Sequence, residues 1–302
     1  MMKPKVTIAI PLYKSAPFYE NIIRNIEVFP DNDVEIIISD RHSFDDTIDR
    51  LAEYFADKPN VICIKQSDEL NWVQHINVLL KEAKGEYWRF LPHDDISPAG
   101  SLESLVSALD LNKNAVLTYG PTVAIDYDEN PLSQFDQPSP HPHEAKYGWT
   151  FGLALKMFWN GFCDGAFKGL IRRNLIIEKG LFIRCTKDLI LPERCWLFAL
   201  ALTGPFIYVD NALYIKRFYN GSVHSKWKIK SKHYLSAAQV MSEYLEQLFG
   251  LGAEWKYGTM DLISNANRFA HWVKNPQEER PVYKAASWKN NDNIMNRVLS
   301  IR

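Results

Sequence analysis

Short apolar runs and amphipathic stretches alternate along the first 120 residues. Five of the runs are continuously apolar and rich in β-branched side chains, at residues 6–13, 34–40, 60–66, 86–91 and 115–120. A strand that is apolar on both faces is typical of a parallel sheet, because helices cover both sides of such a sheet. The pattern therefore predicts five buried strands in this part of the chain.

Helical periodicity fills the segments between these runs. Ser97 and Pro98 provide an N-cap and a first-turn proline for the last of the predicted helices. Repeated strand–helix units predict an α/β fold with a doubly wound, mostly parallel sheet, which binds ligands at the carboxyl ends of its strands. The apolar positions that share a helix face are Phe18, Ile22, Ile23 and Ile26; Ile48, Leu51 and Phe55; Val73, Ile76, Leu80 and Ala83; and Leu102, Leu105, Val106 and Leu109.

The pattern changes after residue 120. Residues 121–150 are rich in proline, polar and aromatic side chains, which predicts a long loop and suggests a lid over a site. Regular patterns then predict a strand and a helix that ends at Gly180, a helix that begins at Pro192, a strand at 206–218 with a kink at Asp210, and helices after residue 225. We therefore expect three consecutive parts, residues 1–120, 121–225 and 226–302.

Composition excludes several classes of protein. The 302 residues are 46% apolar and 24% charged with a net charge of −1, so no overall field favours nucleic acid, and we predict no nucleic-acid partner. The longest apolar stretch, 195–209, is shorter than the roughly 20 residues of a membrane helix. The four cysteines form no C-x-x-C pair, and the first strand begins close to Met1. These features predict no structural zinc, no signal peptide and a reduced, cytoplasmic setting.

Carboxylates stand at the ends of two predicted strands, where a ligand would bind. Asp40 closes the second strand, and Asp94 and Asp95 follow the fourth, whereas no glycine-rich phosphate loop follows the first strand in PLYKSAP. Adjacent carboxylates repel each other, but they hold Mg²⁺ or Mn²⁺, which in turn binds phosphate. The alternative is that Asp94 and Asp95 only precede a helix N-terminus, which favours negative charge. The residues alone leave both interpretations open.

Three segments together resemble a known family. VTIAIPLYK, VEIIISDRHSFDDT and ELNWVQHINVLLKEAKGEYWRFLPHDD cover roughly residues 5–120. They resemble the first strand, the second strand with its acidic turn, and the segment that leads into the D-x-D motif of the inverting nucleotide-sugar glycosyltransferases of GT-A fold, glycosyltransferase family 2. The resemblance implies transfer of a sugar from a nucleoside-diphosphate donor, with UDP-sugars favoured, to a hydroxyl of a glycan or lipid-linked acceptor, with Mg²⁺ or Mn²⁺.

The resemblance also implies roles for individual residues of the donor side. Asp40 would contact the nucleoside or, as the alternative, cap its turn, and Asp94 would hold the metal with Asp95 as a second candidate. Two positions depart from the family pattern, because Arg41 and Pro92 stand where members often carry an Asp. The further donor-site candidates are Pro11, Tyr13, Asn71 and Asn77.

The acceptor side is expected in the second half of the chain. By resemblance, Glu193 at the start of a helix would take the proton from the acceptor hydroxyl, with Asp188 as the alternative base. Members often carry Glu-Asp where this chain has Glu193-Arg194. A first-turn glutamate also serves a helix dipole without any catalytic role. Trp196 and Arg217 are the acceptor-binding candidates.

Two other functions remain as alternatives. A sugar nucleotidyltransferase would open with a glycine-rich basic loop, which PLYKSAP lacks, and a catalytically silent nucleotide-sugar-binding protein would tolerate the replaced acidic positions. The 226–302 extension leaves three roles open: packing on the core, formation of a homodimer, or peripheral contact with the inner face of a membrane that carries a lipid-linked acceptor.

Overall fold

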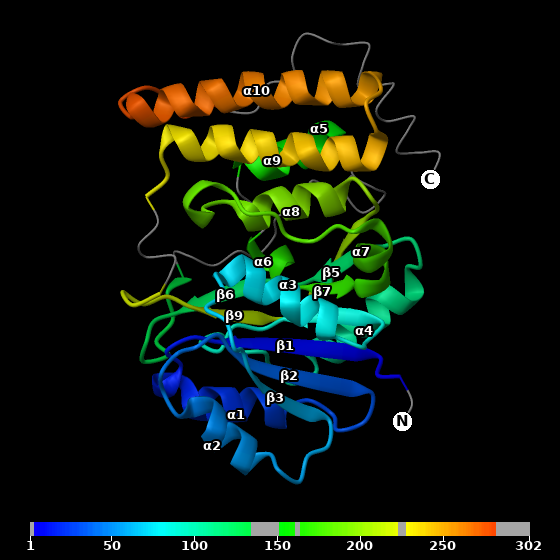
Figure 1. Ribbon diagram of the computed structural model, residues 1–302, viewed down its shortest axis with the longest axis vertical. Coiled ribbons are helices and arrows are strands. Elements are labelled where there is room, and N and C mark those ends of the chain that lie inside the picture. Colours follow the sequence, from blue (N-terminus) through cyan, green and yellow to red (C-terminus); the bar gives the residue numbers. More distant parts are fainter. Residues whose placement is uncertain (1–2, 134–150, 161–163, 223–227, 282–302) are drawn as a thin grey trace. The chain divides into compact units, whose positions relative to one another are not determined.

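The computed structural model describes residues 3–133, 151–160, 164–222 and 228–281, so part of the predicted 121–150 loop lies outside the described residues. The described chain forms two compact units (Figure 1). The first contains residues 3–133, 165–180 and 207–222, and the second contains 151–160, 181–206 and 228–281. The predicted donor residues and Arg217 lie in the first unit, and Glu193, Asp188 and Trp196 lie in the second.

A seven-stranded sheet forms the centre of the first unit. β1 to β4 run parallel, and β7 runs antiparallel to both β4 and β5. This confirms the predicted α/β fold with a mostly parallel sheet. In their order across the sheet, the strands are β3 (Val61–Lys65), β2 (Val34–Asp40), β1 (Val6–Leu12), β4 (Tyr87–Phe90), β7 (Leu170–Arg172), β5 (Leu117–Tyr119) and β8 (Phe206–Tyr208).

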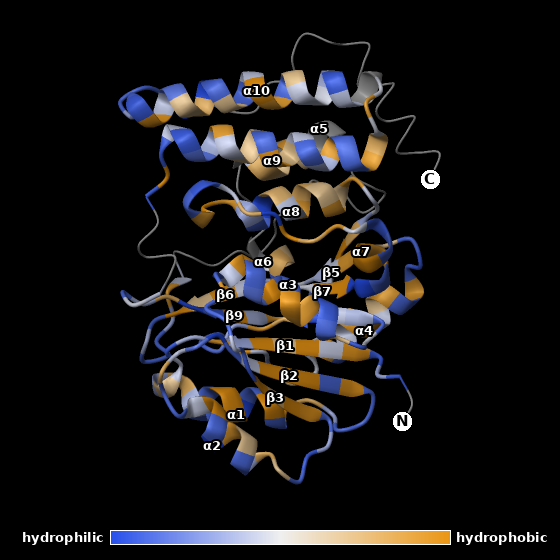
Figure 2. Ribbon diagram, in the orientation of Figure 1, coloured by the Kyte–Doolittle hydropathy of each residue, from blue (hydrophilic) through white to orange (hydrophobic). Residues whose placement is uncertain are grey.

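Strand register brings the carboxyl ends of three strands to one edge of the sheet. Leu12 at the end of β1 pairs with Asp40 at the end of β2, and Ala9 of β1 pairs with Phe90 at the end of β4. Tyr13, Arg41 and the loop after β4 therefore leave the sheet at the same edge. Figure 2 shows that β1 and β2 are hydrophobic along most of their length, as strands buried on both faces must be.

Helices of the first unit bury the faces that the periodicity predicts. Ile22, Leu51, Leu80 and Leu105 are each almost inaccessible to solvent. α7 ends at Gly180, as predicted, because this glycine adopts the left-handed conformation, with φ 63°, that closes a helix without steric cost. These helices are η1 (Ala16–Phe18), α1 (Tyr19–Glu27), α2 (Thr47–Tyr54), α3 (Trp72–Glu82), α4 (Ser101–Leu111) and α7 (Arg173–Lys179); a short helix, α6 (Asp164–Phe167), begins just before this part of the chain.

The start of α4 differs from the prediction. The helix begins at Ser101 after Gly100, which has φ 78°, and Ser97 does not cap it. Ser97 is instead buried, and its hydroxyl accepts a hydrogen bond of 2.9 Å from Nη1 of Arg89. A buried guanidinium needs hydrogen-bond acceptors, so Arg89 binds the Ser97 hydroxyl that the sequence pattern had assigned to the helix cap.

A small second sheet corrects two further predictions. β6 (Thr122–Ile125) lies inside the predicted 121–150 loop and pairs in parallel with β9 (Tyr214–Arg217). The predicted kinked strand at 206–218 is therefore two strands, β8 and β9, that belong to different sheets. Gly120 lets the chain before β6 pass close to Ala212, because a Cβ at residue 120 would lie 1.9 Å from the carbonyl oxygen of Ala212.

Helices make up the second unit. α8 begins at Pro192, as predicted, and Trp159 of α5 stacks on Phe269 of α10 with ring centroids 4.9 Å apart. α9 and α10 lie side by side (Figure 1) and confirm the predicted helices after residue 225. The elements are α5 (Phe151–Asn160), η4 (Lys187–Leu189), α8 (Pro192–Ala201), α9 (Ser231–Phe249) and α10 (Ala253–Lys274).

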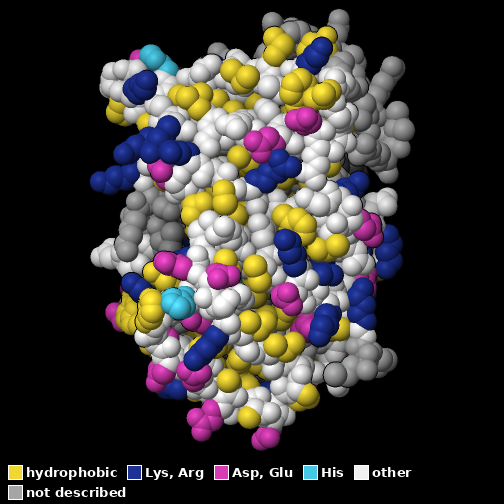
Figure 3. Space-filling model, viewed as in Figure 1, with side chains coloured by type: hydrophobic (Ala, Val, Ile, Leu, Met, Phe, Trp, Pro, Cys, Tyr) yellow, Lys and Arg dark blue, Asp and Glu magenta, His cyan; other side chains and the backbone are white. Residues whose placement is uncertain are grey.

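The surface of the second unit carries a local basic cluster. Figure 3 shows Lys and Arg side chains gathered near the beginning of α9, where Lys228, Lys230 and Lys232 are exposed. The net charge of −1 for the whole chain therefore conceals a concentrated positive region. None of the described helices combines the length and the apolar character that a bilayer crossing requires.

Candidate functional site

Asp95, in the loop that follows β4, is enclosed by hydrogen bonds. Its Oδ2 accepts a bond of 2.5 Å from the hydroxyl of Tyr214, and its Oδ1 accepts one of 2.9 Å from the backbone N–H of Arg217. The residue is 3% exposed, and burial together with the neighbouring Asp94 raises the pKa of its carboxyl. Both oxygens of Asp95 are thus used to attach this loop to β9.

Two asparagines of α1 hold the same loop from another side. Nδ2 of Asn21 donates to the carbonyl oxygens of His93 at 2.8 Å and Asp95 at 2.9 Å, and Nδ2 of Asn25 donates to Asp95 at 2.8 Å. Oδ1 of Asn25 also accepts from the backbone N–H of Ser97 at 2.9 Å. We did not predict this role, although two buried polar side chains at i and i+4 beside isoleucines are a signal for it.

Arg217 joins the loop to the turn that follows β6. Its Nε donates to the carbonyl oxygen of Asp94 at 2.8 Å, and its Nη1 donates to that of Tyr127 at 2.8 Å. Its Nη2 bonds Oε1 of Glu129 at 2.8 Å, and Glu129 also pairs with Arg24 at 2.5 Å. Hydrogen bonds from Arg24 and then from Arg217 lower the pKa of Glu129 to about 2. We call Arg24, Glu129 and Arg217 the charged clamp.

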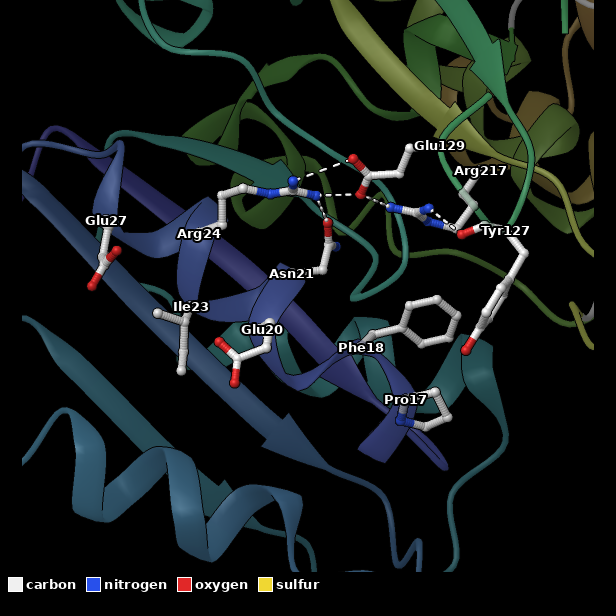
Figure 4. Close-up of a pocket in the computed structure, with 10 residues that line it drawn as sticks. All are labelled: Pro17, Phe18, Glu20, Asn21, Ile23, Arg24, Glu27, Tyr127, Glu129 and Arg217. Carbon is white, nitrogen blue, oxygen red and sulfur yellow. Dashed lines mark hydrogen bonds and ion pairs between the residues drawn. The ribbon is translucent and has the colours of Figure 1, made fainter. Parts of the chain in front are cut away.

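A cavity of about 430 Å³ lies beside the charged clamp. Figure 4 shows the Arg24 and Arg217 side chains reaching Glu129 from opposite sides, with the rings of Phe18 and Tyr127 on the wall below. Phe18 also contacts the rings of His93 and Tyr219, at centroid distances of 5.4 and 5.3 Å. The cavity is lined by Pro17, Phe18, Glu20, Asn21, Ile23, Arg24, Glu27, Tyr127, Glu129 and Arg217.

Asp94 differs from Asp95 in being only half-buried. Its carboxylate accepts a hydrogen bond from the phenol of Tyr219, and burial together with this carboxylate raises the pKa of Tyr219. Among the described residues, no group of three or more His, Cys, Asp or Glu is arranged to hold a metal ion. A single open carboxylate fits Mg²⁺ or Mn²⁺, because these ions commonly take one or two protein carboxylates and complete their coordination with phosphate oxygens and water.

Asp40 lies at the end of β2 and is buried, at 7% exposed. Its Oδ2 accepts a bond of 2.9 Å from the backbone N–H of Ser43, and its Oδ1 contacts the Ser43 hydroxyl. Asp40 therefore makes the turn-capping interaction that the sequence suggested as the alternative. Pro11 lies nearby in β1, and its carbonyl oxygen is 3.2 Å from Nδ1 of His93, which links this edge to the Asp94 loop.

Arg41 covers Tyr13 at this edge of the sheet. Its guanidinium carbon lies 3.9 Å from the centroid of the Tyr13 ring, and its Nη1 donates to the carbonyl oxygen of Leu70 at 2.9 Å. Behind it, the hydroxyl of Ser39 contacts Nε2 of His75 at 2.9 Å. Burial and the nearby Arg41 lower the pKa of His75 to about 4, so this histidine is neutral at physiological pH.

The two predicted asparagines of the donor side lie at and within α3. Asn71 is the N-cap of this helix, and its side chain accepts a 3.0 Å bond from the backbone N–H of Gln74. The Gln74 side chain in turn accepts a hydrogen bond of 3.0 Å from the backbone N–H of Asn71, and the two bonds together form a capping box. Asn77 lies within the helix, about one turn after Gln74, and is half-buried.

Glu193 lies in the first turn of α8, in the second unit, and is 7% exposed. The preceding segment is unusual because Asp188, Leu189 and Leu191 all adopt left-handed backbone conformations, with φ of 55°, 54° and 72°. Such strain in residues other than glycine concentrates at functional sites. The Asp188 carboxylate bonds Lys232 and Nε2 of His233, and these bonds lower its pKa to about 2.

Trp196 and Arg217 were predicted to contact the acceptor, but both side chains are buried in this structure. Trp196 is fully buried, and its indole N–H donates to the carbonyl oxygen of Leu181 at 2.6 Å. The Arg217 side chain is 3% exposed and all its nitrogens are engaged in the charged clamp and the Asp94 loop. Both side chains therefore act within the fold of their own unit in this structure.

Comparison with solved structures shows that the chain has the GT-A fold. Residues 1–349 of TarS from S. aureus, in complex with UDP-GlcNAc, have a TM-score of 0.59 and 13% identity, and the match covers 90% of this chain and 87% of that one. The mannosyltransferase PcManGT of Pyrobaculum calidifontis, in complex with GDP-Man and Mn²⁺, has a TM-score of 0.56 and 14% identity over 100% of this chain and 81% of that one.

The family follows from the sequence match. The model described as glycosyl transferase family 2 matches residues 7–178, so the chain belongs to this family. An uncharacterized glycosyltransferase of Rickettsia prowazekii is 28% identical over 130 residues, which are 43% of this chain and 40% of that protein. A poly(ribitol-phosphate) beta-glucosyltransferase of Bacillus spizizenii is 30% identical over 155 residues, 49% of this chain and 24% of that protein. The matches thus span less than half the length of these relatives.

Proposed function

We propose that the chain transfers a sugar from a nucleoside-diphosphate donor, with UDP-sugars favoured, to a hydroxyl of a glycan or lipid-linked acceptor, with inversion and with Mg²⁺ or Mn²⁺. The observation that carries this proposal is Asp94, an open carboxylate on a loop that is otherwise fixed by buried hydrogen bonds. Structures with the same fold contain UDP-GlcNAc, or GDP-Man with Mn²⁺, which supports this donor class. The Bacillus relative, named for poly(ribitol-phosphate), supports a polymeric acceptor.

Asp94 is the residue that we propose to hold the metal. When bound, the ion offsets the negative charge that develops on the departing diphosphate. Asp95 is the weaker of the two predicted ligands, because Tyr214 and the Arg217 backbone already occupy its oxygens. Its role in the proposal is to fix the loop so that Asp94 stays at the edge of the sheet, where Tyr219 orients its carboxylate.

Glu193 is the base in the proposal. It takes the proton from the acceptor hydroxyl, the hydroxyl oxygen bonds the anomeric carbon, and the bond from that carbon to the diphosphate oxygen breaks, so one displacement inverts the configuration. Asp188 is a poor alternative, because a carboxylate with a pKa of about 2 binds protons weakly at neutral pH. Trp196 is left out of the acceptor site because it is buried, and Arg217 is retained as a loop-positioning residue.

The test is a screen of nucleotide sugars with the purified chain, with and without Mn²⁺, for thermal stabilisation and donor hydrolysis. The proposal expects one donor class to stabilise the protein and to be turned over only with the metal. Asp94→Asn should abolish the metal-dependent stabilisation, whereas Glu193→Gln should retain it and lose turnover. Asp188→Asn is the matched control and should retain both.

Two outcomes would contradict the proposal. If nucleotide sugars bind with Mn²⁺ but no acceptor or water receives the sugar, the chain is the catalytically silent binding protein. If Asp188→Asn and not Glu193→Gln abolishes turnover, the assignment of the base is wrong although the function stands.

A further inference from the structure

Arg41 is held in one position at the carboxyl edge of the sheet. Its backbone N–H donates to the carbonyl oxygen of Leu12 at 3.3 Å, its guanidinium covers the ring of Tyr13 at 3.9 Å, and its Nη1 donates to Leu70. Tyr13 is 39% exposed, so the stacked pair forms part of the surface at this edge. A guanidinium that is stacked and bonded at one nitrogen has lost most of its rotational freedom.

The guanidinium of Arg41 has few partners in the part of the chain that the structure describes. Within the described residues, no carboxylate forms an ion pair with Arg41, although Asp40 and Glu69 lie close enough to influence its pKa, and Nη1 is the only guanidinium nitrogen with a hydrogen-bond partner. Burial lowers the pKa of Arg41, which reflects the cost of withdrawing this cation from water. A ligand that brings an acceptor to the remaining nitrogens would offset that cost, and such perturbed groups concentrate at functional sites.

Asp40 and Arg41 present complementary chemistry side by side. An ionised carboxylate only accepts hydrogen bonds, and a guanidinium only donates them. Uracil and thymine carry a ring N–H beside a carbonyl oxygen, and guanine does the same. Cytosine and adenine carry an unprotonated ring nitrogen in that place, which would direct a lone pair at the carboxylate.

We propose that Arg41 is a specificity-determining residue that donates to a carbonyl oxygen of the donor's base while Asp40 accepts from the adjacent ring N–H. The pair then selects donors that carry uracil, thymine or guanine over those that carry cytosine or adenine. The inference rests on the proposed function and refines it. It assigns a role to Arg41, which stands where family members often carry an acidic residue.

The experiment measures the dissociation constants of UDP, dTDP, GDP, CDP and ADP for the full chain by calorimetry with Mn²⁺. The wild type should bind at least one of UDP, dTDP and GDP at least tenfold more tightly than CDP and ADP. Arg41→Met keeps the side-chain stem and should weaken the favoured nucleotides by about 10- to 100-fold, the scale of a charge-assisted bond. CDP and ADP should change by less than about threefold, so the preference shrinks.

Arg50→Met is the matched control. Arg50, on α2, covers Tyr19 at the same 3.9 Å, so this variant removes an equally close arginine–tyrosine stack away from the proposed contact. It should leave all five dissociation constants unchanged. Arg41→Lys keeps the charge without the planar fork and should give intermediate losses, and it decides the question if thermal melting shows that Arg41→Met is unfolded.

The inference is overturned if Arg41→Met weakens all five nucleotides equally, which would assign Arg41 to the phosphates, the ribose or the fold, or if it weakens none. It is also overturned if the wild type binds CDP or ADP as tightly as the others. Binding of no nucleotide by the wild type would instead contradict the proposed function itself.

Discussion

The loops after β2 and after β4 leave the same edge of the sheet but are held in opposite ways. Asp40 is bonded to Ser43, three residues further along the chain. Asp95 is bonded to Arg217, which is 122 residues away, and its carbonyl oxygen to Asn21, 74 residues away. The Asp40 carboxylate is thus fixed by its own turn, whereas the loop after β4 takes its shape from α1, β9 and the turn after β6. The comparison teaches that the two candidate contacts with a donor depend on the rest of the fold to different extents.

The largest expected effect concerns Asp94, the open end of the distant network. Asp94→Ala should lower metal-dependent turnover by at least about a hundredfold, the scale of removing one charge-stabilising group from a transition state. Its melting temperature should stay close to that of the wild type, because the half-buried side chain bonds only Tyr219 among the described residues. Steady-state kinetics and thermal melting measure the two effects. Normal turnover by Asp94→Ala would show that the metal does not bind at this loop.

Asp95, the next residue, should show the reverse pattern. Asp95→Ala leaves the hydroxyl of Tyr214 and the backbone N–H of Arg217 without their acceptor, which costs about 2–4 kcal/mol of unfolding free energy. Urea denaturation measures this loss, and Asp94→Ala is the control at the adjacent position. A stability loss as small as that of Asp94→Ala would show that the buried bonds do not hold the loop.

Arg217→Lys tests whether the charged clamp positions the metal-binding carboxylate. Lysine keeps the charge but cannot bond Asp94, Tyr127 and Glu129 together, so the Mn²⁺ concentration for half-maximal turnover should rise about tenfold. Turnover at saturating Mn²⁺ should fall less, which a general loss of stability would not produce. Arg24→Lys is the control, because Arg24 reaches this loop only indirectly, through Asn21 and through Glu129, and it should change the Mn²⁺ requirement by less than about threefold.

Glu129 has the smallest expected effect, and its effect depends on pH. Its pKa of about 2 in the folded chain lies below its ordinary value of 4.5, so its ion pairs stabilise the protein above pH 4.5. This contribution is lost as the pH falls from about 4.5 to 2. Because the side chain is 44% exposed, the difference in unfolding free energy between wild type and Glu129→Gln should be only about 0.5–1 kcal/mol above pH 5. Chemical denaturation at several pH values tests this, and a difference that grows below pH 4 would have the wrong sign.

The features that the sequence predicted are those with local causes. Continuous apolar runs identified the strands, helical spacing identified the buried faces, and Gly180 and Pro192 marked the helix ends. Asp40 and Asp94 were chosen as candidates because a carboxylate after a buried strand is visible within a few residues, and their contacts with a donor stay a prediction. The resemblance of residues 5–120 then supplied the family, which the comparison confirmed.

The remaining features depend on contacts that are distant in sequence. Nothing near Asp95 indicates that Tyr214 and Arg217 will approach it, because the pairing of β6 with β9 brings them there. Ser97 matched the pattern of a helix cap, but its hydroxyl instead accepts a hydrogen bond from Arg89, which is buried in β4 and requires acceptors. Trp196 was predicted to bind the acceptor because a tryptophan ring can stack on a sugar, but the structure buries it completely.

The pairing of β6 with β9 has a consequence for the order of synthesis. A nascent chain that ends at residue 178 already contains the whole segment that matches the family, including Asp94 and Asp95. It still lacks Tyr214 and Arg217, which donate to Asp95, and Tyr219, which donates to Asp94; these residues are synthesised about 40 residues later. On the ribosome, strands β1 to β4 can therefore form before the loop after β4 takes its final shape, and a truncated family segment would contain Asp94 and Asp95 without the contacts that fix them.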